Sequence, residues 1–235
     1  SPPPSSLLPM CGRYSFAPSP KQVAERLSRL DQPPGWKISY NIAPTQQALV
    51  QTLQQPGRLQ PMAWGLVPHW SRDGANSGRL INARAETVLE KPSFRDAVRQ
   101  RRCLVPADSF YEWRREAGGR KLPYRILPAN GDLLFLAGLW DEWRQGDELR
   151  RSFSIITTAP NREMATLHDR MPLFFPNEAE QALWLSARSD EQLAALMRPP
   201  ADGLLHMYRV SEKLNTPTHD TPDLHQQVPE EARLF

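Results

Sequence analysis

Cys11 would offer two neighbouring nucleophiles, an amine and a thiol, if it were the N-terminal residue. It lies in the run MCGRY, directly after Met10. If translation began at Met10 and that methionine were removed, Cys11 would carry an α-amine with a pKa of about 7.7–8.0 and a thiol with a pKa of about 8.5. Together these two groups can convert an aldehyde into a five-membered thiazolidine ring. The alternative is a small, buried core side chain.

Glu112 is a candidate for proton transfer. It lies in SFYEWRRE, where strand alternation places Phe110, Glu112 and Arg114 on one face and Tyr111 and Trp113 on the other. A carboxylate among aromatic rings can have a raised pKa, which would suit a general acid or base. The alternative is an exposed strand residue paired with a neighbouring arginine.

His168 is the second candidate for proton transfer. It lies in TLHDRMP, where Asp169 or Arg170 could orient its ring. A histidine positioned in this way can donate or accept a proton near neutral pH. The alternative is a structural histidine at the end of a short helix.

Further polar and aromatic residues are of the kinds that hold a substrate or a nucleic acid. Asn82 in LINARAET could orient a polar substrate group, and Arg84 would share its face in an extended segment. Basic and aromatic side chains stack bases and hold a single-stranded backbone. The residues of this kind are Arg13, Trp64, Trp70 and Trp113. The alternatives are a turn asparagine, a solvated arginine and tryptophans that belong to the core.

Short apolar runs in the middle of the chain must position these groups. The runs ALVQTL, LQPMAWGLV, RCLVPA, FYEWRRE, LPYRIL, LLFLAGLW and FSIITTA are separated by Gly, Pro, Asn and Asp, which predicts strands of a mainly antiparallel sheet or barrel. A further strand is predicted at LLHMYRV, followed by a polar tail from Ser211.

Helices are predicted only at the edges of this strand region. A helix is expected from Ser19 to Leu30, with Val23, Leu27 and Leu30 at helical spacing. Later helices are expected after Asn177 and after Ser189, which forms a capping-box pattern with Gln192.

Length and composition favour one α+β domain with a β-rich, barrel-like core and short flanking helices. The chain has 235 residues, 24 of them proline, no visible repeat and no long linker. Residues 1–9 contain four prolines and three serines and are expected to be a flexible extension before a domain at 10–235. A net charge of +3 permits contact with nucleic acid without requiring it.

The sequence lacks the motifs that are typical of nucleotide-binding proteins, serine hydrolases and zinc proteases. The motifs GxxxxGK[ST], GxGxxG, GxSxG and HExxH are absent, and the five histidines show no pairing typical of a metal site. Two cysteines cannot form a structural zinc site, and no stretch is apolar enough to span a membrane. We therefore expect a cytoplasmic protein without a cofactor or metal, and no contact with a membrane.

Six motifs in order resemble the SRAP family, the SOS-response-associated peptidase-like proteins. They are MCGRY at Met10–Tyr14, YNIAPTQ at Tyr40–Gln46, AWGLVPHW at Ala63–Trp70, LINARAET at Leu80–Thr87, FYEW at Phe110–Trp113 and LHDRMP at Leu167–Pro172. The resemblance runs from Met10 to about Val210. It implies a barrel-like α+β domain that senses abasic sites in single-stranded DNA and becomes covalently attached to them.

The resemblance also implies roles for individual residues. By position, Cys11 resembles the crosslinking cysteine, Asn82 the asparagine that holds the site, Glu112 the acid/base carboxylate and His168 the catalytic histidine. Arg13 and Arg84 resemble its phosphate-binding arginines. The implied partner is single-stranded DNA that contains abasic sites, and crosslinking one strand requires only a monomer.

One departure from the family pattern affects the chemistry. Residues Ser1–Pro9 precede Met10, so Cys11 as written has an amide nitrogen instead of a free amine. An extension added for expression, an upstream start codon or a propeptide would each explain this, and we expect Cys11 to be N-terminal in the active form. Two alternatives stay open. One is a cysteine peptidase or autoprocessing enzyme that uses Cys11 and His168, and the other is a non-catalytic single-strand-binding module.

Overall fold

The computed structural model describes residues 12–75 and 78–229. Its strands are β1 (Tyr14–Phe16), β2 (Ser39–Ile42), β3 (Gln47–Thr52), β4 (Gln55–Trp64), β5 (Asn82–Arg84), β6 (Arg102–Ala107), β7 (Ser109–Arg115), β8 (Lys121–Pro128), β9 (Leu134–Gln145), β10 (Glu148–Thr158), β11 (Met171–Pro172) and β12 (Leu205–Arg209). The α-helices are α1 (Pro20–Gln22), α2 (Arg95–Gln100), α3 (Arg162–Ala165), α4 (Glu178–Ser186) and α5 (Asp190–Leu196).

Five strands close into a barrel. The order β10-β4-β3-β6-β9 returns to β10 through the long β9–β10 hairpin, and β5 and β11 add to β10. The β10–β4 and β10–β5 pairings are parallel and the others are antiparallel. The prediction of a mainly antiparallel, barrel-like α+β fold is therefore confirmed.

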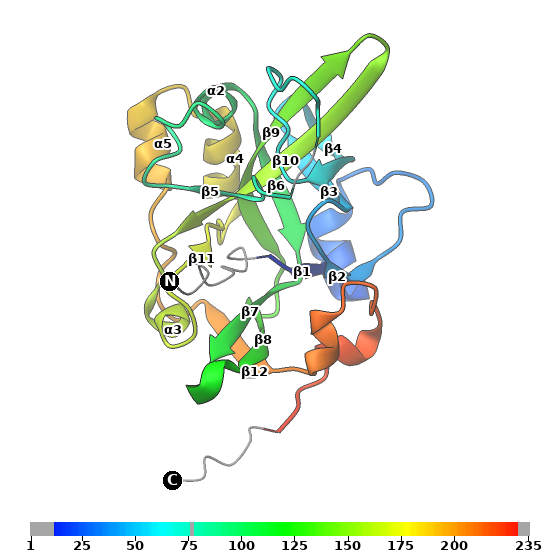
Figure 1. Cartoon of the computed structure of the whole chain (residues 1–235), viewed down its shortest axis with the longest axis vertical. Coiled ribbons are helices and arrows are strands. Elements are labelled where there is room, and N and C mark those ends of the chain that lie inside the picture. The colour runs from blue at the N-terminus through cyan, green and yellow to red at the C-terminus, as the bar shows by residue number, and fades with distance from the viewer. Residues whose placement is uncertain (1–11, 76–77, 230–235) are drawn as a thin grey trace, which may run out of the picture.

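A second sheet lies beside the barrel in the order β12-β8-β7-β1-β2 (Figure 1). The chain passes from the barrel to this sheet between β6 and β7, where Asp108 separates the two strands. Its β7 follows the predicted alternation, because Phe110 joins the main core while Tyr111 and Trp113 pack in a second, smaller cluster on the opposite face.

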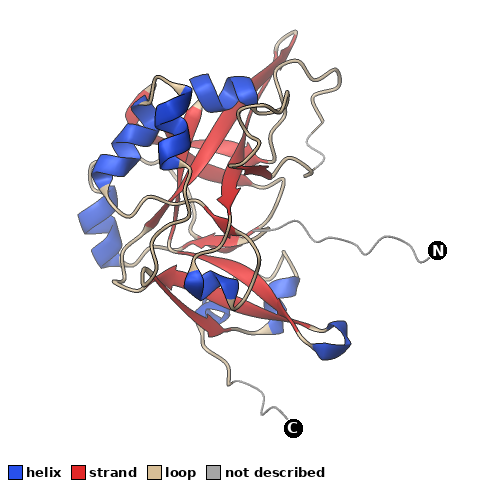
Figure 2. Ribbon diagram, turned by 90° about the vertical axis from the view of Figure 1, so that its left-hand side faces the viewer, coloured by secondary structure: helices blue, strands red, loops and turns tan. Residues whose placement is uncertain are grey.

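The helices lie mainly on one side of the barrel, where α2, α4 and α5 gather (Figures 1 and 2). Asn177 caps α4, and Ser189 and Gln192 form the predicted capping box of α5. The helix expected from Ser19 to Leu30 is shorter than predicted. After α1 the chain forms a π-helix, η1 (Val23–Leu27), in which Val23 is exposed and Leu27 is buried.

The residues after Ser211 are not the polar tail that the sequence predicts. They form two 3₁₀ turns, η3 (Glu212–Asn215) and η4 (Pro222–His225), which lie against the second sheet. Leu214 and Leu224 are fully buried there beside Tyr111. We call residues 211–226 the C-terminal strap.

Candidate functional site

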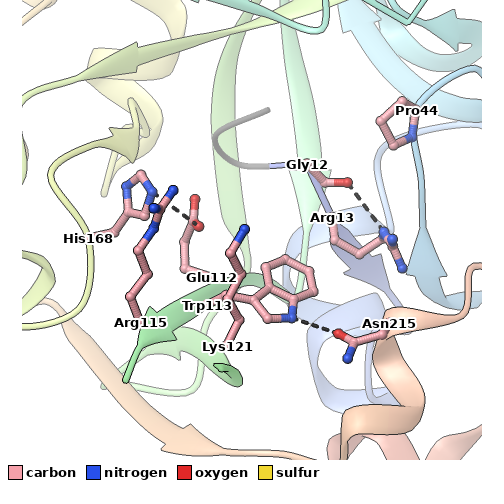
Figure 3. A pocket seen from close by; sticks show the side chains of 9 residues that line it. All are labelled: Gly12, Arg13, Pro44, Glu112, Trp113, Arg115, Lys121, His168 and Asn215. Carbon is pink, nitrogen blue, oxygen red and sulfur yellow. Dashed lines mark hydrogen bonds and ion pairs between the residues drawn. The ribbon is translucent and has the colours of Figure 1, made fainter. Parts of the chain in front are cut away.

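A pocket of about 390 Å³ opens between the second sheet, the segment after α3 and the C-terminal strap. Figure 3 shows its lining side chains. The lining residues are Gly12, Arg13, Pro44, Glu112, Trp113, Arg115, Lys121, His168 and Asn215. The pocket thus brings together two predicted acid–base residues and the residue that directly follows Cys11 in the sequence.

Glu112 supplies a carboxylate from the middle of β7. The strand is paired on both sides, with β8 and with β1, so its backbone is fixed. Only 3% of Glu112 is exposed, yet the residue lines the pocket. A carboxylate that is held in place and shielded from bulk water is suited to proton transfer.

His168 faces Glu112 from the segment that follows α3. Its Nε2 lies 3.9 Å from Glu112 Oε2. Its Nδ1 accepts a hydrogen bond of 3.1 Å from the backbone N–H of Arg170. When Nδ1 accepts from Arg170, the neutral ring carries its proton on Nε2, on the side of Glu112. Both neighbours considered from the sequence contact this nitrogen, since Oδ1 of Asp169 also lies 3.1 Å from Nδ1.

The side chain of Arg170 anchors the same segment. Its Nη1 and Nη2 donate to the two carboxylate oxygens of Glu86 at 2.7 and 2.9 Å, and Nη2 also donates to the carbonyl of Thr157 at 2.8 Å. A bidentate arginine–carboxylate pair fixes both direction and distance. The loop that carries His168 is thereby fastened to β10 and to the LINARAET segment.

Asn82 and Arg84 lie on β5, outside the set of pocket-lining residues. The strand pairs with β10, and Ala83 points into the core, so Asn82 and Arg84 share the opposite face as expected. Asn82 is half-buried and Arg84 is exposed. Arg84 lies near Glu86 of the Glu86–Arg170 pair, whereas Glu112 and His168 line the pocket.

Arg13 lines the pocket but is largely engaged by the protein itself. Its Nη1 donates to Asn41 Oδ1 at 2.8 Å and to the carbonyl of Leu214 at 2.7 Å, and its Nε donates to the carbonyl of Gly12 at 3.3 Å. Burial lowers the pKa of Arg13. Within the described residues its Nη2 makes no hydrogen bond, so this edge is the part of the group available to a ligand.

The three predicted stacking tryptophans lie in different environments. Trp113 lines the pocket, and its Nε1 donates to Asn215 Oδ1 at 2.7 Å. Trp70 is 54% exposed but lies outside the pocket lining. Trp64 is fully buried in the core, where it packs against Tyr14 and donates to the carbonyl of Ile81. The prediction that Trp64 contacts DNA is therefore wrong, since no base can reach its ring.

Asn41 is a positioning residue that sequence reasoning missed. It is 1% exposed, accepts from Arg13, and donates through Nδ2 to the carbonyls of Thr216 at 3.1 Å and His219 at 2.8 Å. It therefore joins β1, β2 and the C-terminal strap behind the pocket. Its place in YNIAPTQ, one of the six family-like motifs, was the available signal. Other lining residues missed from the sequence are Pro44, Arg115, Lys121 and Asn215.

Of the two cysteines, the structure describes Cys103. Cys11 and the proposed extension at 1–9 lie outside the described residues. Cys103 is fully buried in β6, and burial raises the pKa of its thiol. A buried, protonated thiol is a poor nucleophile, so Cys103 is unsuited to covalent chemistry.

A metal site requires a cluster of ligating side chains, and a membrane-spanning helix requires a long apolar stretch. Across residues 12–75 and 78–229, no three His, Cys, Asp or Glu side chains gather into a group able to hold a metal ion. None of the helices in the same ranges is long and apolar enough to cross a membrane.

Comparison with known proteins gives consistent matches. Residues 10–217 match the family model described as SOS response associated peptidase. The chain is 39% identical over 225 residues to the abasic site processing protein YoqW of Bacillus subtilis, covering 92% of this chain and 98% of YoqW. It is 30% identical over 265 residues to mouse abasic site processing protein HMCES, covering 91% and 75%. A crystal structure from Bacteroides thetaiotaomicron superposes with a TM-score of 0.79 at 28% identity, covering 93% of this chain and all of that one.

Proposed function

Since the chain belongs to the SOS response associated peptidase (SRAP) family, we propose that it processes abasic sites in DNA, as the names of its relatives from B. subtilis and mouse state for those proteins. In the specific form of the proposal, the protein senses abasic sites in single-stranded DNA and shields them in a covalent crosslink through Cys11. The observation that carries the proposal is the Glu112–His168 pair, which faces a pocket that Gly12 also lines.

Ring opening is the first chemical step. An abasic deoxyribose is mostly a closed hemiacetal, and its C1′ becomes an aldehyde only when a proton leaves the C1′ hydroxyl and another reaches the ring oxygen. Glu112 and the Nε2–H of His168, 3.9 Å apart, offer an acceptor and a donor for these two transfers. Either residue can take either role, because both sit at the same pocket wall.

Crosslinking is the second step. The α-amine of Cys11 attacks C1′, water leaves to give an imine, and the thiolate adds to the same carbon. Aldehyde, amine and thiol thus yield a thiazolidine and one water. This step requires a free α-amine, so we propose that residues 1–10 are absent from the active form. N-terminal sequencing of protein from its native source tests this, and finding only chains that start at Ser1 would count against it.

The strand is proposed to bind through cationic and aromatic groups around the pocket. Arg13 offers its Nη2 edge, Arg84 is exposed on β5, and the Trp113 ring lines the pocket. Trp70 is exposed and is available to a more distant part of the strand. Such contacts make the first, reversible binding step sensitive to salt.

Intact mass under denaturing conditions tests the proposal. A chain that starts at Cys11 is incubated with single-stranded DNA that carries one abasic site. We expect a gain equal to the DNA mass less one water. The Ser1-started chain and Cys11→Ala should show no gain, while Cys103→Ala, the matched thiol control, should form the adduct. An equal gain in Cys11→Ala would overturn the crosslinking mechanism.

Two other outcomes would identify the alternative functions. Reversible, salt-sensitive DNA binding without any adduct would indicate a non-catalytic binding module. Time-dependent loss of residues 1–10 that Cys11→Ala abolishes would indicate autopeptidase activity, and strand cleavage at the abasic site would indicate lyase activity.

Acid–base variants separate chemistry from binding. Glu112→Gln and His168→Gln each remove one proton-transfer group while leaving a hydrogen-bonding side chain of similar size. We expect each to slow adduct formation by about 10²- to 10⁴-fold, with little change in affinity for DNA that carries a non-reactive abasic analogue. A matching loss of affinity would assign the two residues to binding.

A further inference from the structure

Arg115 and Lys121 form a like-charged pair at the rim of the pocket. They are direct cross-strand partners at the end of the β7–β8 ladder, and both line the pocket. Figure 3 shows the two side chains extending from this hairpin to the side where Glu112 and His168 lie. Like charges directly opposite each other destabilise a sheet, so a ligand that neutralises both would relieve this repulsion.

The neighbouring arginines of the same hairpin are neutralised within the protein. Arg114 pairs with Glu116, and Arg120 pairs with Glu212. By contrast, across residues 12–75 and 78–229 no carboxylate lies within ion-pair distance of Arg115 or Lys121. Among the described residues, the hairpin thus pairs the two arginines that do not line the pocket and leaves the two cations that line it without an acidic partner.

We propose that Arg115 and Lys121 together bind one phosphodiester of the DNA strand, next to the abasic sugar. The inference rests on the proposed function and adds the subsite that positions the sugar against Glu112 and His168. The planar guanidinium of Arg115 suits two phosphate oxygens, and the ammonium of Lys121 adds a mobile point charge. These two side chains, in addition to Arg13 and Arg84, set the register of the strand in the pocket.

Equilibrium binding tests the pair without the covalent step. The full chain is titrated into fluorescent single-stranded DNA that carries one tetrahydrofuran residue, an abasic analogue that cannot open to an aldehyde. We expect Arg115→Gln and Lys121→Gln each to weaken binding by about 3- to 10-fold. The double variant should reduce the slope of log K against log salt by about 0.7, the value for one phosphate contact on a single strand.

Arg120→Gln is the matched control, because it removes a cation of the same hairpin that pairs with Glu212 and does not line the pocket. We expect it to bind DNA like the unmodified chain. The melting temperatures of Arg115→Gln and Lys121→Gln should equal or exceed that of the unmodified chain, since each removes a like-charge repulsion. The proposal would be overturned if the double variant bound the tetrahydrofuran DNA as tightly as Arg120→Gln does.

Single neutral linkages locate the phosphate. Each phosphodiester near the tetrahydrofuran is replaced in turn by an uncharged methylphosphonate. One position should weaken binding to the unmodified chain by about 3- to 10-fold and leave the double variant unaffected. Equal sensitivity of both proteins at every position would overturn the paired subsite.

The outcome is distinguishable from failure of the proposed function. If the Cys11-started chain forms the adduct with aldehyde DNA but the double variant binds like the control, only the subsite is wrong. If the unmodified chain neither forms the adduct nor binds the analogue, both proposals fall.

Discussion

Arg102 and Arg13 show how differently two regions of the molecule use an arginine that has no carboxylate partner among the described residues. At one end of the barrel, Arg102 donates to five carbonyls, those of Val98, Arg99, Trp184, Leu185 and Ala187, and so caps the ends of α2 and α4. At the pocket, Arg13 donates to Asn41, Leu214 and Gly12. Burial lowers the pKa of both groups.

The two arginines differ in how many of their guanidinium nitrogens donate to other groups of the protein. Arg102 is 5% exposed, and every nitrogen of its guanidinium donates to a backbone carbonyl. Its role is therefore structural. Nη2 of Arg13 makes no hydrogen bond to another described residue, and Arg13 lines the pocket. The barrel end therefore uses its arginine to satisfy helix termini, whereas the proposed function assigns the arginine at the pocket to the DNA strand.

Arg102→Met is the strongest test of this contrast. It leaves the carbonyls that end α2 and α4 without donors inside the core, which we expect to lower the free energy of unfolding by about 3 to 5 kcal/mol. Denaturant unfolding measures this change. Arg99→Gln is the matched control, because Arg99 forms an exposed bidentate pair with Asp190 and should contribute about 1 kcal/mol or less. Similar losses in the two variants would remove the distinction between scaffold and surface.

Substitutions of Asn41 test whether the position of Arg13 at the pocket matters. Asn41→Leu removes the acceptor of Arg13 and the donor to the C-terminal strap, and we expect it to lower the free energy of unfolding by about 2 to 3 kcal/mol. Asn41→Asp loses only the donor, because a carboxylate still accepts from Arg13. The rate of adduct formation, measured by denaturing mass spectrometry, should therefore fall further in Asn41→Leu than in Asn41→Asp. Equal rates would show that the position of Arg13 does not matter.

His225 gives the two regions different responses to acid. It lies in the C-terminal strap beside Asp108, and burial lowers its pKa from 6.5 to about 4. The unfolded chain binds the proton of His225 more tightly than the folded chain does. The contribution of neutral His225 to the free energy of unfolding is therefore complete above pH 6.5 and is lost as the pH falls towards 4. The loss should be about 2 to 3 kcal/mol.

Hydrogen exchange at several pH values checks this expectation. Between pH 6.5 and 4, amides of the C-terminal strap should lose protection before those of α4. In His225→Gln, which cannot gain the proton, the difference between the two regions should no longer depend on pH in this range. An unchanged pH dependence in this variant would assign it to another group.

Features that depend on residues close together in the chain could be predicted from the sequence. β6 lies where the run RCLVPA predicted it, and the caps of α4 and α5 lie at Asn177 and Ser189, because a short apolar run and a cap are local signals. Glu112 and His168 were identified as a pair through family-like motifs, and the structure places them 3.9 Å apart.

Interactions that depend on distant segments were missed. Arg102 contacts carbonyls about 80 residues away in the chain, for which no local pattern exists. The strap looks polar in sequence, because its buried apolar side chains are two isolated leucines, Leu214 and Leu224. The burial of Trp64 could not be predicted, since composition does not reveal which tryptophans lie in the core.

The smallest expected effect concerns backbone strain beside the pocket. Thr45 follows the pocket-lining Pro44 and has a φ of 73°, a left-handed conformation that is costly for a β-branched residue. Thr45→Gly should remove about 1 to 3 kcal/mol of strain and add about 0.5 to 1 kcal/mol of chain entropy to the unfolded state. The net result is a gain of about 1 kcal/mol, which denaturant unfolding can resolve. Since Pro44 would then be held less tightly, affinity for the tetrahydrofuran DNA should fall by about twofold to threefold. A variant that is both more stable and equally tight in binding would show that the strain does not serve the pocket.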